Sequence, residues 1–350
     1  MTGAVIGVIL LRIIGVHDLL SLYVPYTLFL LIILLLVGLP RPLVGGLFAA
    51  ALVWLIALPR LDSISNAFVY RHIQAIPDAE SLASIYSPFQ KVDVLRDGDG
   101  HLYLFLNGLM DYGTTDLVWF NVLLSGIPAQ LIQPAQMVVV GSGSMSSVGF
   151  ASPFTDHITT VEIDSAVADL SRQYFGALNK LDQVQNWTLV IDDAKHFFGE
   201  VDTRYNLISM DVPAPFTIQE GALHTVEYYA LLKQHLAPAG VVAVSLSSTF
   251  SPTRVLALRV TAGLLANFKQ VMVVTSSNAD LSFAYASDNL PFDSDALEAM
   301  LRADGESKFI IYQPSVVRDI VGTTPPISLD DMRLVWDLSL SRVGRLVGLR

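Results

Sequence analysis

The chain of 350 residues contains no cysteine. Disulfide bonds and thiolate metal sites are therefore excluded, and the redox compartment stays undetermined. Charged residues are also scarce, at 15% of the chain, and acidic residues outnumber basic ones by 32 to 21. The net charge of −11 argues against a nucleic-acid partner and against adhesion to anionic lipid surfaces. The sequence also has no internal repeat and no low-complexity tract.

Charge is scarcest at the start of the chain. Residues 1–58 are strongly apolar, and their charged or histidine side chains are only Arg12, His17, Asp18 and Arg41. The segment Ser21–Leu39 is uncharged and approaches the ~20 residues that a helix needs to cross ~30 Å of hydrocarbon. Leu43–Leu58 follows directly after "PRP", and its small residues would let another helix pack closely. We therefore expect a helical hairpin in a membrane.

A third membrane helix is expected at residues 4–16. This segment is short and contains Arg12, so its length also suits a re-entrant piece or the core of a signal peptide. A cleavable signal peptide is the less favoured alternative, because no basic start is present and two apolar segments follow. His17 and Asp18, with Arg12, could form a polar site inside the membrane or an interfacial turn. The expected partners are thus a lipid bilayer and, through the small-residue helix, a second copy of the chain.

The length of the chain allows roughly two domains of about 150 residues. We expect transmembrane helices at 1–61, a linker at 62–85, a β-hairpin unit at 86–125 and an α/β catalytic domain at 126–350. The hairpin prediction rests on Asp97-Gly98-Asp99-Gly100, which stands between two runs of alternating polar and apolar residues.

After Gln136 the sequence alternates between short apolar runs and helix-length segments. The helical patterns include "SAVADLSRQYF" and "HTVEYYALLKQHL". The predicted strands are Met137–Val140, Ile158–Ile163, Thr188–Ile191, Leu207–Met210, Val241–Leu246, Val271–Val274 and, as a late edge strand, Phe309–Tyr312. Alternating strands and helices predict a parallel sheet in a doubly wound α/β fold. Such folds bind ligands outside the carboxyl ends of the strands.

The predicted strand ends carry residues suited to a nucleoside. The first strand ends in Gly141-Ser142-Gly143-Ser144, a tight turn that lets the backbone approach a ligand. Glu162 follows about twenty residues later, where a carboxylate can accept hydrogen bonds from both ribose hydroxyls. The third strand ends in Asp192-Asp193-Ala194, and the fourth ends in Asp211-Val212-Pro213. No lysine or arginine stands beside the first loop, which argues against a pyrophosphate group on the ligand.

Each of these features also has a structural explanation. The glycine pair could form an ordinary tight turn, and Glu162 could be a solvated surface residue. Asp192 could cap the helix that begins near Ala194, a position that aspartate fills well. Because the features occur together at successive strand ends, we favour a nucleoside site.

Several stretches carry a family resemblance. In order, they are "SPFQKVDVLRDGDGHLYLFLNG", "VVVGSGS", "TTVEIDSAVADLSRQYF", "DDAKHFF", "RYNLISMDVPAP" and "LHTVEYYALLKQHLAPAGVVAV". Residues 86–250 thereby resemble the polyamine aminopropyltransferases, of which spermidine synthase is the type. With its apolar start, the whole chain is similar to bacterial membrane-anchored spermidine synthase-like proteins. The resemblance implies a β-hairpin unit on a methyltransferase-type Rossmann domain that binds decarboxylated S-adenosylmethionine and releases methylthioadenosine, with no metal.

The resemblance also implies roles for individual residues. Gln90 would contact the thioether side of the nucleoside, Glu162 the ribose, and Asp193 with Ala194 the adenine. Asp211 matches the catalytic carboxylate of the family and would deprotonate the attacking amine, which near pH 7 is otherwise mostly ammonium.

Two further aspartates are reserve candidates for the base. They are Asp111 and Asp116, on the segment that leads into the next helix, and each could equally be a solvated turn residue.

The chain departs from the family at the positions that recognise cations. Ser144 stands where the family has an acid that pairs with the aminopropyl ammonium, and Ala214 replaces a second acid that holds the polyamine. Phe120-Asn121 replaces a Tyr-His or Tyr-Gln pair, and His224 replaces a tyrosine. Burying a diamine without carboxylate partners costs several kcal/mol per ion. We therefore expect poor transfer to putrescine.

The altered glycine loop suggests a different tail on the ligand. The backbone N–H groups of residues 143–145, together with the hydroxyls of Ser142 and Ser144, would suit a carboxylate. Our hypothesis is that the ligand is S-adenosylmethionine itself, or its product, rather than the decarboxylated form.

Three functions follow from this interpretation. The first is a transferase or lyase that releases methylthioadenosine, with an unidentified amine or the methionyl tail itself as acceptor. The second is a methyltransferase, which would produce S-adenosylhomocysteine. The third is a non-catalytic membrane protein that binds a nucleoside as a sensor or scaffold. The supply of S-adenosylmethionine predicts an integral inner-membrane protein with its catalytic domain on the cytoplasmic side.

Overall fold

The computed structural model describes residues 29–30, 32–33, 37, 40–72, 74–114, 118–141, 143–215, 217–276, 281–305, 308–336 and 338. The chain divides into two compact units, Met1–Gly113 and Thr114–Arg350. We describe each unit by itself.

The first unit combines one long helix with a small antiparallel sheet. The helix is α3 (Arg41–His72), and the strands are β1 (Glu80–Tyr86), β2 (Lys91–Arg96), β3 (Leu102–Leu106) and β4 (Leu109–Gly113), which pair in that order. The Asp-Gly turn joins β2 to β3, where the Asp97 carboxylate accepts hydrogen bonds from the backbone N–H groups of Asp99 and His101. The stretch 62–85, expected as a linker, holds the end of α3 and β1, so the sheet has four strands instead of a hairpin alone.

The last turns of α3 belong to the core of this unit. Tyr70 is buried, and its hydroxyl donates to the buried carboxylate of Asp93 at 2.7 Å. The Lys91 ammonium lies 3.1 Å from the same carboxylate and donates to Asn66 Oδ1 at 2.6 Å. These polar contacts tie the end of the helix to β2.

The predicted membrane segment is not supported. Among the described residues, no helix has both the length and the apolar character needed to cross a bilayer. The stretch Leu43–Leu58 is not a span of its own, because it is part of α3, which continues to His72 and ends in the core of the β unit. Residues 4–16 and most of 21–39, with Arg12, His17 and Asp18, lie outside the described residues. The predicted location in the inner membrane is therefore wrong, and the described residues give no support for a lipid bilayer as partner.

The second unit contains an eight-stranded sheet in the order β12-β10-β11-β9-β8-β5-β6-β7. Its strands are β5 (Met137–Val140), β6 (Ile158–Glu162), β7 (Trp187–Ile191), β8 (Tyr205–Met210), β9 (Leu236–Ser245), β10 (Gln270–Ser276), β11 (Leu281–Ser287) and β12 (Phe309–Tyr312). Strands β5 to β9 pair in parallel, whereas β11 lies antiparallel between β9 and β10. The predicted doubly wound α/β fold is confirmed for this unit, and β11 is a strand that the sequence analysis missed.

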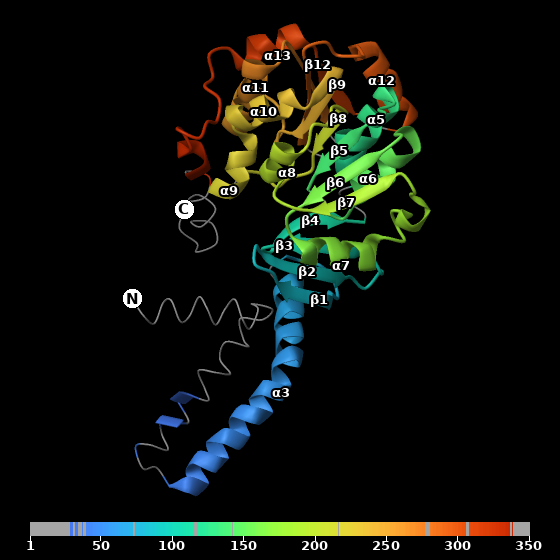
Figure 1. The fold of residues 1–350 in the computed structure, drawn as a ribbon. Coiled ribbons are helices and arrows are strands. Elements are labelled where there is room, and N and C mark those ends of the chain that lie inside the picture. Colours follow the sequence, from blue (N-terminus) through green and yellow to red (C-terminus); the bar gives the residue numbers. More distant parts are fainter. Residues whose placement is uncertain are drawn as a thin grey trace. The chain divides into compact units, whose positions relative to one another are not determined.

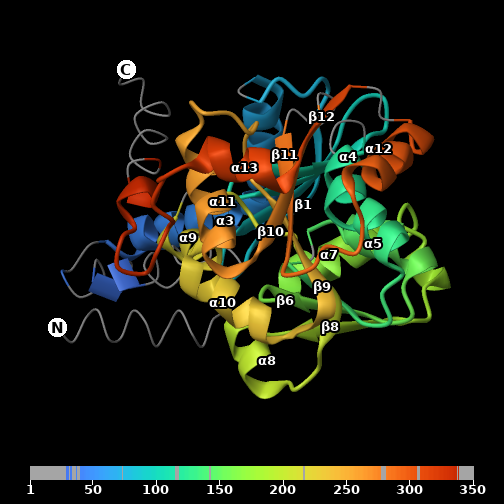
Figure 2. The same cartoon turned by 90° about the horizontal axis from the view of Figure 1, so that it is seen from above.

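The helices of this unit cover both faces of the sheet. They are α4 (Val118–Asn121), α5 (Ile127–Ile132), α6 (Ser146–Ala151), α7 (Ser165–Phe175), α8 (Ala194–Glu200), α9 (Ile218–Gly221), α10 (Val226–Gln234), α11 (Val255–Asn267), α12 (Ser294–Ala303) and α13 (Pro314–Val321), with a π-helix η2 (Val122–Gly126) and short 3₁₀ turns η3 (Ser152–Phe154), η4 (Leu181–Gln183) and η5 (Ala222–His224). Figure 1 shows α10, α11 and α13 on one side of the sheet and α5 and α12 on the other, and Figure 2 shows the same division from above.

Alternation along the strands produces the two cores. Val138 and Val140 pack into the core under α8, α10, α11 and α13, while Met137 and Val139 pack into the core under η2, α5, α6 and α12. Successive side chains of a strand point to opposite faces, so a continuous apolar run is what a sheet covered on both faces requires.

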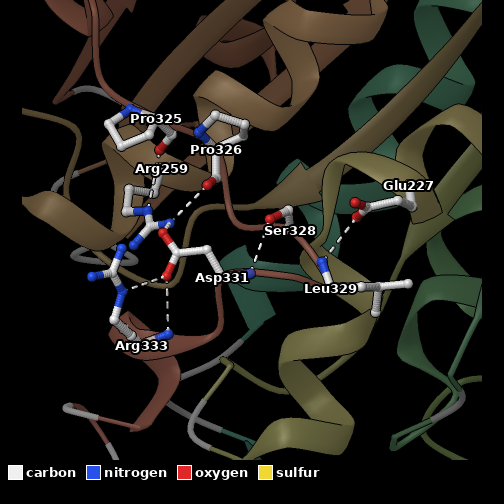
Figure 3. A network of polar contacts seen from close by, with 8 residues as sticks. All are labelled: Glu227, Arg259, Pro325, Pro326, Ser328, Leu329, Asp331 and Arg333. Atoms are coloured by element: carbon white, nitrogen blue, oxygen red, sulfur yellow. Dashed lines mark hydrogen bonds and ion pairs between the residues drawn. The ribbon is translucent and has the colours of Figure 1, made fainter.

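After α13 the chain returns across α10 and α11 (Figure 3). Arg259 on α11 is largely buried and donates to the carbonyls of Pro325 (3.1 Å) and Pro326 (2.7 Å) and to the Asp331 carboxylate (3.1 Å). Glu227 on α10 accepts from the backbone N–H of Leu329 at 3.2 Å. These contacts fix residues 325–331 against the two helices.

Candidate active site

The winding of the parallel sheet reverses in its middle. From β5 the chain adds β6 and β7 on one side and β8 and β9 on the other, so its winding reverses between β5 and β8. At such a point the loops after the two strands diverge and leave room for a ligand. Because β5, β6, β7 and β8 are parallel, their carboxyl ends lie at one edge of the sheet. Gly141, Glu162, Asp192 and Asp211 stand at these four ends.

Gly141 allows two of these loops to touch. Its φ is +87°, and a Cβ at this position would lie 1.9 Å from the carbonyl oxygen of Asp211. Its N–H donates to the Val161 carbonyl at 2.8 Å, and the Asp211 N–H donates to the Val140 carbonyl at 2.8 Å. Gly143 also has a positive φ, +42°. Only glycine adopts this backbone and leaves this space without strain.

Asp211 is a half-buried carboxylate at the end of β8. Its Oδ2 accepts a hydrogen bond from Ser147 Oγ at 3.0 Å. Burial raises the pKa of Asp211 to about 6; the hydrogen bond from Ser147 opposes this shift, and the negative charge of Glu162 adds to it. A carboxyl group with a pKa just below neutral is suited to accept a proton during a reaction at neutral pH.

Ser147 connects Asp211 to a second polar side chain. Its hydroxyl lies 2.7 Å from Asn121 Oδ1, and both residues are buried. A hydroxyl has one proton, so Ser147 can donate to Asn121 or to Asp211 but not to both at once. Sequence reasoning assigned no role to Ser147, because nothing in the local sequence indicates a contact with a residue so far along the chain.

Glu162 is buried at the end of β6. Its Oε1 accepts from the Asp164 N–H at 2.8 Å, and its carbonyl accepts from the Asp192 N–H at 2.9 Å. Glu162, the candidate ribose ligand, thus also holds the start of the loop after β7 through its backbone carbonyl.

The Asp192-Asp193-Ala194 segment ends β7 and begins α8. Asp193 caps the helix by accepting from the N–H groups of Lys195 (2.7 Å) and His196 (3.3 Å). The capping residue is therefore Asp193 and not Asp192. The Asp192 carboxylate lies 2.8 Å from His196 Nδ1, and this hydrogen bond and charge raise the pKa of His196.

Ser144 is engaged within the protein. It is buried, its Oγ lies 2.7 Å from Ser146 Oγ, and its carbonyl accepts from Asn179 Nδ2 at 2.7 Å. Ser146 in turn donates to Asn179 Oδ1 at 3.0 Å. The described part of the glycine loop is thus held by neutral hydrogen bonds. Ser142 lies outside the described residues.

His224 supports the loop that follows Asp211. It is buried, with Nε2 at 3.2 Å from the Pro213 carbonyl and Nδ1 at 3.2 Å from the Tyr229 hydroxyl. Burial lowers the pKa of His224 to about 4, so the ring is neutral at pH 7. Since a carbonyl only accepts, Nε2 carries the proton and Nδ1 accepts from Tyr229. Sequence reasoning identified His224 only as a departure from the family pattern.

Two other candidates lie in the first unit. Gln90 is in the turn before β2, where its carbonyl accepts from the N–H and the hydroxyl of Ser87. Asp111 is half-buried on β4. Asp116 lies outside the described residues. The roles expected for these three residues stay predictions.

One group among the described residues has the composition of a metal site. Asp97, Asp99 and His101 in the β2–β3 turn place their ligand atoms within 4.8 Å of one another. Asp97 Oδ2 already lies 3.0 Å from His101 Nδ1 and accepts from the Tyr103 hydroxyl at 2.9 Å. The turn is therefore explained by its own hydrogen bonds.

Comparisons with known proteins agree on the second unit. Residues 134–289 match the family described as the spermine/spermidine synthase domain. The polyamine aminopropyltransferase of Thermoplasma volcanium is 27% identical over 203 residues, which are 56% of this chain and 72% of the relative. That of Mycobacterium tuberculosis is 27% identical over 280 residues, 73% of this chain, but the match spans about half of the relative, 52%.

Solved structures show the same fold. A probable spermidine synthase from Corynebacterium glutamicum has a TM-score of 0.57 at 18% identity, covering 72% of this chain and 96% of that one. A spermidine synthase in complex with the transition state analogue AdoDATO has a TM-score of 0.55 at 17% identity, covering 74% and 88%. The resemblance read from the motifs is confirmed: residues 134–289 match the spermine/spermidine synthase domain, and the chain is similar to polyamine aminopropyltransferases.

Proposed function

We propose that the chain is an enzyme of the aminopropyltransferase type that cleaves a sulfonium nucleoside and releases methylthioadenosine. The donor is S-adenosylmethionine or its decarboxylated form. The observation that carries the proposal is Asp211, a half-buried carboxylate in contact with the glycine loop and with a pKa raised to about 6. The family match supports the choice of chemistry.

The other strand ends supply the nucleoside site. Gly141 and Gly143 let the backbone approach the ligand, Glu162 holds the ribose hydroxyls, and the segment Asp192-Asp193-Ala194 lies at the adenine. Two carboxylates at the ends of adjacent parallel strands, one of them buried, support these roles. Gln90 is assigned to the thioether side on the resemblance alone.

Asp211 would take the proton from the acceptor amine. The amine nitrogen attacks the carbon that joins the donor's aminopropyl or methionyl tail to the sulfonium sulfur, and a new N–C bond forms. The C–S bond breaks, and its electron pair goes to sulfur, which becomes the neutral thioether of methylthioadenosine. The nitrogen then loses one proton to Asp211. A base whose pKa lies near the working pH performs this transfer well.

The donor's tail is set by the glycine loop. The relatives are named polyamine aminopropyltransferases, which favours the decarboxylated donor. Ser144 brings no charge to pair with an ammonium, which favours S-adenosylmethionine itself. Calorimetry with both compounds on the purified protein decides between them, because tighter binding of the decarboxylated compound would refute the carboxylate hypothesis.

A product assay tests the proposed function. The full chain is incubated with each donor and an amine mixture, and methylthioadenosine is measured by chromatography. S-adenosylhomocysteine as the product would indicate a methyltransferase, and binding without turnover would indicate a non-catalytic protein. The Asp211→Asn variant should lose at least about 100-fold in rate, since a positioned base contributes roughly 10²–10⁴-fold. Its unchanged affinity for methylthioadenosine is the control for folding.

A further inference from the structure

The loop that carries Asp211 offers a single negative charge. Residues 211–215 read Asp-Val-Pro-Ala-Pro, so four of the five side chains cannot ionise. The next carboxylate along the chain, Glu220, accepts from the Thr217 N–H at 2.8 Å as part of the capping box of α9. Glu220 therefore serves the helix end.

Among the residues that the structure describes, the side chains that hydrogen-bond to this loop from other elements are neutral. Ser147 from α6 reaches Asp211 itself, and Asn121 at the end of α4 reaches Ser147. His224 holds the Pro213 carbonyl with an uncharged ring, and its second nitrogen is occupied by Tyr229. Each of these groups already has a protein partner, so none is a second anchor for a cation.

Glu162, whose charge acts on Asp211, is assigned to the ribose, and several other described residues of this region are apolar. Ala214 is half-buried, Pro215 is buried, and Val212 packs against the core. Phe120, beside Asn121, presents its ring edge to Phe283 with centroids 5.4 Å apart. A chain of CH₂ groups would find apolar contacts here, whereas an ammonium group would lose its hydration without a carboxylate in exchange.

We infer that the acceptor is a primary amine with one cationic group and an apolar remainder, and not a diamine. This inference rests on the proposed function. The reacting amine is the group that Asp211 deprotonates, and the N–C and C–S bond changes are those given above. Apart from this reacting amine, the acceptor molecule carries no second charge.

Matched amines test the inference. The full chain and its preferred donor are given butylamine or putrescine, which share four carbons and differ by one amino group. Hexylamine and 1,6-diaminohexane form a second pair. We expect kcat/KM for methylthioadenosine release to be at least about tenfold higher with the monoamine of each pair, because an uncompensated charge costs at least one factor of ten. A preference for the diamines would overturn the inference.

A charge variant tests the cause. Ala214→Asp places a second carboxylate three residues after Asp211, and it should shift the monoamine-to-diamine ratio at least about tenfold towards the diamine. Ala214→Asn has nearly the same shape without the charge, and the ratio should stay within about twofold of the wild type. Equal shifts in both variants would contradict a charge-based selection. If Ala214→Asp does not fold, the wild-type pairs decide alone.

Failure of the inference about the acceptor can be distinguished from failure of the proposed function. Release of methylthioadenosine with a preference for diamines overturns the acceptor class and leaves the proposed function standing. No release with any amine and either donor overturns both.

Discussion

At the scale of single residues, Ser147 tunes the candidate base. Its hydroxyl donates to Asp211 and thereby lowers the pKa of a carboxyl group that burial has raised. Replacing Ser147 by alanine removes this hydrogen bond, so the pKa of Asp211 should rise further above about 6. Because the base must be deprotonated to act, the acid limb of the kcat/KM profile should move to higher pH by about one unit.

The matched control is Ser171→Ala. Ser171 is also a buried serine of this region, but its hydroxyl donates to the Gly143 carbonyl and does not contact Asp211. This variant should leave the acid limb in place. A titration of ¹³C-labelled aspartate by NMR measures the same shift without turnover. An unmoved acid limb in Ser147→Ala would show that Ser147 only fills space.

Gly141 is the residue at which geometry forbids a side chain. A methyl group there would collide with the Asp211 carbonyl, and the φ of +87° adds strain. Gly141→Ala should lower the free energy of unfolding by at least about 1–3 kcal/mol and displace Asp211. Gly199→Ala on α8 is the control, because a Cβ there meets nothing within 4 Å and helix propensity favours alanine by about 0.5–1 kcal/mol. Urea denaturation compares the two, and equal losses would refute the steric argument.

The candidate site could be predicted residue by residue only in part. Glu162 and Asp211 were recognisable because an acid directly after an apolar run marks the end of a buried strand. Ser147 and Asn121 were not recognisable as partners, because their hydrogen bonds join residues far apart in sequence. The Ser147–Asp211 contact, for example, spans 64 positions.

At the scale of elements, apolar runs identified most strands of the eight-stranded sheet well. Met137–Val140 and Phe309–Tyr312 coincide with β5 and β12, and "SAVADLSRQYF" coincides with α7. Strand β11 was missed because "LSFAYAS" mixes small, polar and aromatic residues and has few β-branched ones, so its pattern does not indicate a buried strand. It forms a strand because β9 and β10 supply hydrogen bonds on both edges.

Arg259 makes most of the side-chain hydrogen bonds that hold the segment after α13 against α10 and α11. Arg259 makes three hydrogen bonds to residues 325–331 and is largely buried (Figure 3). Arg259→Met should reduce the free energy of unfolding by about 1–3 kcal/mol, because two carbonyls lose their donor and the Asp331 carboxylate keeps only Arg333. Arg302→Met on α12 is the control, since Arg302 forms an exposed pair with Glu298 and should cost less than about 1 kcal/mol. Equal costs in chemical denaturation would show that the segment does not depend on Arg259.

At the scale of the whole molecule, the doubly wound fold was predicted correctly, whereas the described residues do not support the predicted membrane segment. Hydropathy evaluates a stretch of sequence in isolation. It did not indicate that Leu43–Leu58 lies within a longer helix whose last turns, with Tyr70 and Asn66, are buried against a β-sheet. The apolar stretch Leu43–Leu58 therefore has to be interpreted together with the polar residues that follow it in the same helix.

Two groups near the candidate site, His224 and Asp211, should contribute to the pH dependence of global stability with opposite sign. The pKa of His224 falls from 6.5 to about 4 on folding, so between these values the unfolded chain binds more protons and acidification destabilises the protein. The pKa of Asp211 rises from 3.8 to about 6, so over nearly the same range the folded chain binds more protons and acidification stabilises it. The two contributions should therefore largely cancel.

Separating the two groups makes the cancellation visible. Asp211→Asn removes the contribution of Asp211 that opposes that of His224, so the free energy of unfolding should fall by roughly 3 kcal/mol more than in the wild type between pH 6.5 and pH 4. In His224→Gln, which keeps a neutral donor for the Pro213 carbonyl, the protein should instead lose less stability than the wild type on acidification. Urea denaturation of the three proteins at half-unit pH steps measures these slopes. If the free energy of unfolding changed with pH in parallel for the three proteins, neither group would change its protonation on unfolding. That result would also refute a neutral His224 in the folded protein.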